Sequence, residues 1–183
     1  MNQIFLRKIV LLTTVVTLTG VCGFAQSKAP GNWPMPTGCY ARSYSADHLA
    51  KHPQQVVHKI AVKFGTWERS PVAGLQVIAA NQGLARENNQ GGQHFAGGSE
   101  CFVEPWPDGM GATLGWICLS ATNSGEIFLS RFDDEMLVFR TKQFVMGESE
   151  NPLGVLDLAE VPDQWVTYKL RKADDAQCVD WEG

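Results

Sequence analysis

Residues 54–64 read Gln-Gln-Val-Val-His-Lys-Ile-Ala-Val-Lys-Phe, and this stretch decides the fold class. From position 56 onward, every second residue is apolar except for His58, while the alternate positions include Lys59 and Lys63. A period of two is typical of a β-strand with one face on a core and one face in water. The sequence therefore predicts a strand here, with His58 near the open end of its apolar face.

More segments with strand-like composition follow at the spacing of hairpins. Short groups of Asn, Asp, Gly and Pro separate them, for example at 88–92 and 105–109. Such short connections favour antiparallel pairing over parallel strands joined by helical crossovers. We therefore expect an all-β, mainly antiparallel domain with the architecture of a barrel or a sandwich. The predicted strands are 75–80, 93–103, 114–119, 126–131, 136–141, 144–147 and 165–170.

One short helix is expected near the start of this domain, over residues 45–52. Ser45 can cap the free amides of a first helical turn, and Asp47 suits the positive end of the helix dipole. Pro53 cannot continue the helix, so the segment should end there after about two turns.

A secretory signal peptide is predicted at residues 1–25, because two basic residues precede the apolar run 9–21, which ends in small residues. The Pro-rich segment 26–37 is interpreted as a linker or peripheral arm, and 38–183 as one domain. After cleavage, no apolar run approaches the roughly 18–20 residues that span a bilayer. We therefore expect a periplasmic or extracellular product without a membrane span.

Four cysteines follow the predicted signal peptide, namely Cys39, Cys101, Cys118 and Cys178. An even number in an exported chain indicates two disulfides, for which four cysteines allow three pairings. We favour Cys101–Cys118, which would join adjacent strands of a hairpin, and Cys39–Cys178, which would tie the start of the domain to its end. A metal site is the alternative, but it needs close C-x-x-C pairs, and the nearest two cysteines are 17 positions apart.

The charge balance argues against a nucleic-acid partner. The predicted signal peptide contains two of the 15 basic residues and none of the 19 acidic ones, which leaves the mature chain a net charge of −6. Binding to a phosphate backbone depends on clustered Lys and Arg, and this chain has only scattered basic pairs.

His48 and His52 are the first candidates for a functional site. They are four positions apart, so a helix would place both imidazoles on one face, which is a spacing that zinc ligands use. Further ligands could come only from Asp47, His58 or His94, and the chain lacks the glutamate of the H-E-x-x-H pattern. The alternative is structural, with both rings bonded to nearby backbone groups. We predict no metal or other cofactor, and we name His48, His52 and Gln54 as the candidate polar site.

Several other groups offer weaker chemistry. The acidic run 133–135 suggests either a calcium site or a solvated hairpin tip, and the tip is the more common arrangement. Glu126 with Asp133, or Glu148 with Glu150, would be an acid and base pair if the fold brought them together as a glycosidase requires. No Gly-x-Ser-x-Gly nucleophile motif is present. No catalytic residue is assigned.

Tryptophans are a further candidate class, because an exposed indole can stack on a sugar ring or line an apolar pocket. Trp67, Trp106 and Trp116 are the candidates for this role, and Trp106 lies in the Pro-rich segment 105–109. Trp116 lies inside an apolar strand and is expected in the core.

Gly38-Cys39-Tyr40 and the run Asp47-His48-Leu49-Ala50-Lys51-His52-Pro53-Gln54 lead directly into the first strand. This arrangement resembles a family of uncharacterised secreted bacterial proteins with an H-L-x-x-H-P-x-Q motif and four cysteines. In that family a cysteine pair flanks a Gly-rich turn, and an aromatic strand precedes the last cysteine. The resemblance covers most of residues 38–178 and implies no activity.

The function expected from the sequence is that of an exported, non-catalytic module, which would bind a small apolar ligand or an envelope protein partner. Its basis is an exported β architecture without a catalytic constellation. A metal-dependent hydrolase centred on His48 and His52 is one alternative, and a purely structural envelope protein is another.

Overall fold

The computed structural model describes residues 34–107, 114–121, 124–147 and 152–179. The predicted signal peptide 1–25 and most of the predicted arm 26–37 lie outside these residues. Within them, no helix has the length and apolar character needed to cross a membrane.

The domain is an eight-stranded, closed, antiparallel β-barrel, which confirms the predicted all-β class and decides between the barrel and the sandwich. Neighbouring strands in the wall run β1-β2-β3-β4-β5-β6-β7-β9, and β9 pairs back onto β1. The short β8 adds two residues beside the end of β7. The strands are β1 (Gly38–Ser43), β2 (Val57–Trp67), β3 (Ser70–Ala79), β4 (His94–Glu104), β5 (Gly115–Ser120), β6 (Gly125–Phe132), β7 (Met136–Met146), β8 (Leu156–Asp157) and β9 (Val166–Ala173).

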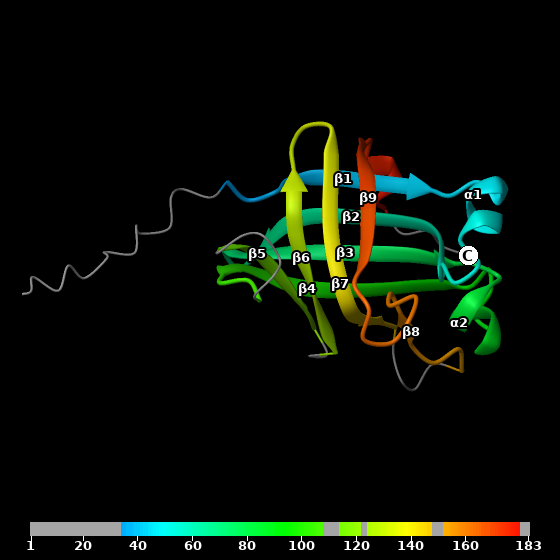
Figure 1. The fold of residues 1–183 in the computed structure, drawn as a ribbon. Coiled ribbons are helices and arrows are strands. Elements are labelled where there is room, and N and C mark those ends of the chain that lie inside the picture. The colour runs from blue at the N-terminus through cyan, green and yellow to red at the C-terminus, as the bar shows by residue number, and fades with distance from the viewer. Residues whose placement is uncertain (1–33, 108–113, 122–123, 148–151, 180–183) are drawn as a thin grey trace, which may run out of the picture. The chain divides into compact units, whose positions relative to one another are not determined.

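Most wall strands follow one another in the chain, so the barrel is an up-and-down meander. Figure 1 shows β6, β7 and β9 crossing in front of β1 to β4 at a steep angle, as expected where a strongly twisted sheet closes on itself. Two short helices, α1 (Ala46–Lys51) and α2 (Gly83–Glu87), lie at the same end of the barrel (Figure 1).

The alternation seen in residues 56–64 positions β2 in the wall. Ile60, Val62 and Phe64 are buried in the main core, as the sequence predicts. His58 differs from the expectation, because the pairing with β3 shifts register between Val57 and Lys59. This irregularity places Val57 in the core and leaves His58 exposed.

The interior of the barrel is filled by side chains. An eight-stranded barrel encloses a space just wide enough for them, and the inward positions here carry many large apolar groups. Tyr168 brings its hydroxyl into this core and donates a hydrogen bond of 2.8 Å to the carbonyl of Leu158. The largest core side chains with less than 2% exposure are Tyr168, Phe139, Phe144, Ile60, Leu75, Ile127, Leu137, Met146, Leu156, Leu158 and Leu170; Phe128 is equally buried but does not belong to this core.

The predicted helix at 45–52 is confirmed, with Ala46–Lys51 as its helical residues. The Ser45 hydroxyl accepts a hydrogen bond from the amide of His48, which is the expected capping contact. The second helix, α2, was not predicted. The side-chain amide of Gln82, just before α2, donates to the carbonyls of Leu49 and His52, which joins the two helices at this end of the barrel.

Strand β7 corrects the prediction of two separate strands at 136–141 and 144–147. It is continuous, but its pairing with β6 shifts register after Thr141. The Thr141 hydroxyl donates to the carbonyl of Glu126 at 2.7 Å and accepts from the amide of Gln143 at 3.0 Å. The shift reverses the apolar alternation, which is why the sequence resembles two strands.

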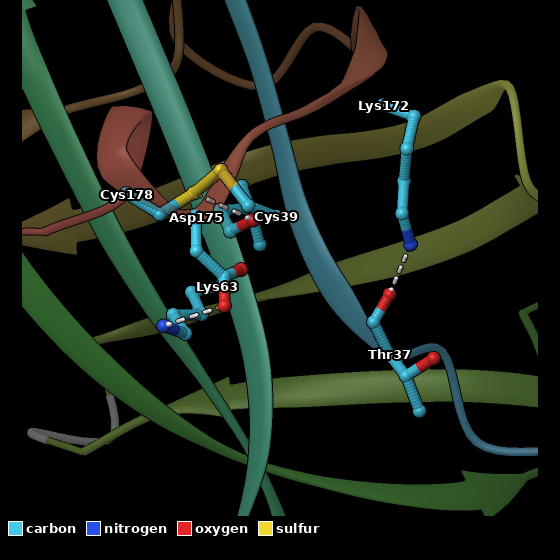
Figure 2. Close-up of a disulfide and its surroundings, with 7 residues drawn as sticks. Thr37, Cys39, Lys63, Lys172, Asp175 and Cys178 are labelled. Atoms are coloured by element: carbon cyan, nitrogen blue, oxygen red, sulfur yellow. Dashed lines mark hydrogen bonds and ion pairs between the residues drawn. A yellow bond between two sulfur atoms is a disulfide. The ribbon is translucent and has the colours of Figure 1, made fainter.

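Both expected disulfides are present. Cys101 and Cys118 face each other on β4 and β5, and both are buried in the core. Cys39 on β1 bonds Cys178, which follows the short 3-10 helix η1 (Asp175–Gln177). Figure 2 shows this bond beside an ion pair of 3.6 Å between Lys63 and the carboxylate of Asp175.

The described end of the predicted arm packs on the barrel. Met35 contacts the main core, Pro36 is buried, and the indole of Trp116 donates to the carbonyl of Pro34 at 3.2 Å. The ammonium group of Lys172 donates to the Thr37 carbonyl at 2.7 Å (Figure 2). Residues 34–37 are therefore part of the folded domain.

Candidate functional site

An aromatic cluster lies on the outer face of the wall formed by β5, β6 and β7. Ile127 and Leu129 on β6 belong to the main core, so Phe128 between them projects from the opposite face of the strand. The Phe128 ring packs edge-to-face with the Trp165 ring at 5.4 Å between centroids and with the Trp106 ring at 5.8 Å. Trp106, Phe128 and Trp165 form the outer aromatic cluster.

Basic side chains and one glycine hold this cluster in place. The Arg140 guanidinium lies 5.1 Å, and the Lys142 ammonium 5.3 Å, from the centre of the Trp165 ring. Cations at such distances are attracted to the face of an indole. At Gly115, a Cβ would stand only 2.6 Å from the Trp106 ring, so the absence of a side chain makes room for that indole.

The cluster borders a cleft of about 720 Å³, which we call the aromatic cleft. Its volume lies in the usual range for small-molecule sites, about 300–1,000 Å³. Carboxylates outnumber cations in its lining, because Glu126, Asp157 and Asp163 are opposed only by Lys142. Trp165 supplies the accessible aromatic surface of this lining, because Phe128 is only 1% exposed.

Glu126 is the distinctive polar group of the aromatic cleft. Burial raises the pKa of its carboxyl group above the usual value, and the nearby charge of Glu104 raises it further. Within the described residues, Glu126 forms no ion pair. A partly desolvated carboxylate without a counter-charge favours a ligand that brings a positive charge or a proton donor.

Asp157 has a structural task in the same lining. One carboxylate oxygen accepts hydrogen bonds of 3.0 Å from the amides of Phe144 and Ala159. These bonds fix the segment around β8 against β7. Asp163 is exposed and has a backbone φ of 60°, a conformation that side-chain-bearing residues rarely adopt. It leads within two residues to Trp165 and sets the path of the chain there.

A second cleft of about 380 Å³ lies next to the first, and Trp165 lines both. We call it the histidine cleft. It lies where α1, β1 and the start of β9 meet, so residues distant in sequence line it together. Its polar and charged lining residues are Arg42, Tyr44, His48, His52, Gln55, Glu160, Thr167, Tyr168 and Lys169.

Four of these side chains form a continuous stack. The Arg42 guanidinium lies 4.5 Å from the centre of the Tyr44 ring. The Tyr44 and His48 ring centres are 4.9 Å apart, and the His48 and His52 rings stack at 4.3 Å. The helical spacing of four thus brings the two histidines together, as the sequence predicts, but through ring stacking.

Gln55 orients His48. Its side-chain nitrogen donates to the Val57 carbonyl at 2.8 Å, so its oxygen is the atom that faces His48 Nε2 at 3.0 Å. Since that oxygen can only accept, His48 Nε2 carries the hydrogen. The other ring nitrogen, Nδ1, is then the acceptor of the neutral imidazole.

Burial raises the pKa values of three acids that line the histidine cleft, namely Tyr44, Glu160 and Tyr168. It raises the pKa of Tyr44 to about 12, an effect that the charge of Arg42 opposes and that of Glu160 reinforces. Burial also raises the pKa of the Glu160 carboxyl group, while the charge of His48 acts in the opposite direction. The cleft therefore combines fixed cations with one carboxyl group that takes up a proton more readily than usual.

Gln54, the third residue of the predicted polar site, is exposed and lies outside both clefts, and Gln55 makes the contact with His48 instead. The pattern H-L-x-x-H-P-x-Q could have identified Gln55 instead of Gln54, because its final glutamine falls at position 55 when its first histidine is His48. The short turn after Pro53 decides which glutamine faces the helix.

The structure brings no third metal ligand to His48 and His52 within the described residues. Among the residues that the structure describes, no group of three or more His, Cys, Asp or Glu side chains is placed to hold a metal ion. His58 is exposed on β2 at the register shift, as described above.

Of the two predicted carboxylate pairs, the one that the structure describes, Glu126 with Asp133, does not form a catalytic dyad. Glu126 and Asp133 are seven positions apart along β6 and its turn, which corresponds to about 23 Å in an extended strand. A glycosidase pair is separated by roughly 5–9.5 Å. Glu148 and Glu150 lie outside the described residues.

Asp133 is used within its own turn. Its carboxylate accepts from the amides of Glu135 and Met136 and bonds the Arg131 side chain at 2.6 Å. The hydrogen bond from Arg131 and those from the two amides hold the pKa of Asp133 below its usual value. The acidic run 133–135 is thus a hairpin tip between β6 and β7, as the sequence favours.

The tryptophans separate into distinct environments. Trp116 is 6% exposed and belongs to the core, which confirms the expectation. Trp67 is 71% exposed at the hairpin between β2 and β3. Trp165 and Phe128 were missed as site residues. A signal existed for Phe128, because this large apolar residue stands between Glu126 and Ser130 in the phase of the strand opposite to Ile127 and Leu129.

Comparisons with protein-family models, with curated proteins and with solved structures find no significant match for this chain. A function therefore has to be inferred from the two clefts, their shapes and their charges.

Proposed function

We propose that this chain is an exported, non-catalytic binding module whose small ligand occupies the aromatic cleft. The observation that carries the proposal is the juxtaposition of the half-buried Trp165 ring, which packs on Phe128, with the partly buried carboxylate of Glu126, which has no ion-pair partner among the described residues. A ligand with one flat apolar face and one cationic or hydroxyl group fits this lining.

The filled interior of the barrel supports an external site. The inward-facing side chains fill the barrel interior, so the interior has no room for a ligand. The aromatic cleft opens on the outside of the wall. Stacking a ring on an aromatic side chain contributes about 0.5–1.5 kcal/mol beyond the area that it buries. Arg140 and Lys142 already hold the Trp165 ring, so its ordering costs little when a ligand binds.

The two disulfides support the predicted periplasmic or extracellular location, since such bonds persist in oxidising compartments. They also support the non-catalytic assignment of the four cysteines, because a sulfur in a disulfide is no thiolate nucleophile. The structural envelope role remains the competing function, and it requires no ligand at either cleft.

Titration with benzylamine tests the proposal, because this probe pairs a flat ring with an ammonium group. We expect saturable amide shifts in 15N-labelled protein at β6, β7 and the segment around Trp165, with benzyl alcohol binding more weakly. Trp165→Leu should weaken benzylamine about fivefold to tenfold, which corresponds to a stacking loss of about 1–1.4 kcal/mol.

Trp67→Leu is the matched control, because it removes an indole that lies in neither the aromatic nor the histidine cleft. It should bind benzylamine like the unaltered protein. If benzylamine and benzyl alcohol both fail to saturate, or if the two tryptophan variants behave alike, the aromatic cleft is not a ligand site and the structural role is favoured.

A further inference from the structure

The aromatic cleft and the histidine cleft share the Trp165 side chain as part of their lining. They are therefore neighbours on one surface, although α1 and β1 contribute only to the histidine cleft. A ligand that stacks on Trp165 in one cleft lies at the border of the other. The chemistry of the second cleft consequently bears on which ligands the first can select.

The two clefts have opposite charge. In the aromatic cleft, the lining has three carboxylates and the Lys142 ammonium group, and the Arg140 guanidinium lies nearby on the Trp165 ring, so acidic groups still outnumber basic ones. In the histidine cleft, Arg42 and Lys169 face the single carboxyl group of Glu160, and His48 and His52 add positive charge when they are protonated. Opposite potentials at adjoining clefts are the arrangement that selects a ligand carrying both signs of charge.

The cations of the histidine cleft have donors to spare. One guanidinium nitrogen of Arg42 donates to the Lys169 carbonyl at 3.0 Å, which fixes the group while leaving other N–H donors. Within the described residues, the Lys169 ammonium group has no ion-pair partner. Stacking on Tyr44 restricts the Arg42 side chain further, so an anion would meet a cation that is already ordered.

Glu160 is the group that opposes an anion here. It is half-buried, and burial raises the pKa of its carboxyl group, so its charge is held less firmly than that of an exposed glutamate. His48 Nε2 is committed to Gln55, so His48 contributes through charge and through Nδ1. His52 also lines the cleft and is exposed.

We infer that the histidine cleft is an oxyanion subsite of the same binding surface, so that the ligand is bipolar. Its flat, cationic part occupies the aromatic cleft, and a carboxylate or phosphate group lies among Arg42, His52 and Lys169. This inference rests on the proposed function and specifies the ligand class for it.

Inorganic phosphate is the probe for the oxyanion subsite, because it lacks a ring and does not depend on stacking. We expect saturable amide shifts confined to β1, α1 and the start of β9. Lys169→Gln should weaken phosphate about fivefold, the effect of losing one charge-assisted contact of about 1 kcal/mol. The same variant should leave benzylamine binding unchanged.

Arg69→Gln is the matched control, because it removes one exposed positive charge at the hairpin between β2 and β3 and lies in neither cleft. It should not alter phosphate binding. In addition, phosphate should still bind when benzylamine is saturating, because the two probes occupy separate subsites. Circular dichroism of each variant checks that the fold is retained.

The outcomes separate the two proposals. If benzylamine binds but phosphate shifts spread over all exposed cations, or if Lys169→Gln and Arg69→Gln have equal effects, phosphate is an adventitious ion only and the oxyanion subsite is refuted. If phosphate and benzylamine exclude each other, the bipolar ligand is refuted. If benzylamine does not bind, the proposed function itself fails, together with the inference that rests on it.

Discussion

The Cys39–Cys178 disulfide allows a prediction whose size follows from the chain topology. It joins residues separated by 139 positions, whereas Cys101–Cys118 spans 17. We consider two double variants, Cys39→Ala with Cys178→Ala and Cys101→Ala with Cys118→Ala. A crosslink restricts the unfolded chain, and the restriction grows with the logarithm of the loop length.

The loop-entropy relation gives a loss of about 5 kcal/mol in the free energy of unfolding for the long loop and about 3 kcal/mol for the short one. Lost core packing adds more to the stability loss of the Cys101/Cys118 variant than to that of the Cys39/Cys178 variant. Cys101 and Cys118 lie in the main core, while Cys39 and Cys178 pack in a small outer cluster with Ala41 and Ala61. The two losses are therefore expected to be similar in total but different in origin.

Urea unfolding followed by tryptophan fluorescence and by circular dichroism distinguishes the origins. Freeing the 139-residue loop lets the unfolded chain expand, so the dependence on urea concentration, the m value, should rise more in the Cys39/Cys178 variant. The reasoning is refuted if the m value of that variant is unchanged and its stability loss is below about 2 kcal/mol. A larger m-value change in the Cys101/Cys118 variant would refute it equally.

Three further predictions concern single side chains. Glu126→Gln should raise the melting temperature at pH 7, because the pKa of Glu126 is raised in the folded state and its charged form therefore destabilises the fold above that pKa. The gain should vanish below about pH 4, where the acid is protonated in both the folded and the unfolded state. A variant that is less stable at pH 7 would contradict this prediction. Ser45→Ala should cost about 1 kcal/mol in urea unfolding, since it removes the cap of the His48 amide, and Ser43→Ala, outside the helix, should cost less. Tyr168→Phe should cost about 1–3 kcal/mol in the same measurement because the Leu158 carbonyl then loses its donor inside the core, and a neutral result would show that the bond is dispensable.

Local alternation was sufficient to predict the barrel wall, because each strand has one face on a single core. The pattern of Ile60, Val62 and Phe64 gave the correct inward face of β2. The pairing of Cys101 with Cys118 followed from hairpin spacing in the same way. The register shift in β2 was beyond such reasoning, since it depends on pairing with β3, and it moved His58 outward.

The candidate site was only partly predictable because long-range contacts build it. The helical spacing of His48 and His52 is local and was read correctly. Trp165 acquires its importance from Phe128 and Arg140, which approach it from neighbouring strands. A linear sequence shows neither approach, so the cleft between them could not be deduced from periodicity.

The antiparallel neighbours β1 and β9 close the ring with the two ends of the described domain, and the bond between Cys39 and Cys178 brings their Cα atoms within 5.9 Å. A short peptide could therefore connect the ends of the domain, and new termini could be opened at the exposed hairpin after Trp67. Such a circularly permuted chain would keep every wall pairing except the broken turn. Each strand has the same neighbours wherever the chain begins, so the architecture has no privileged starting point.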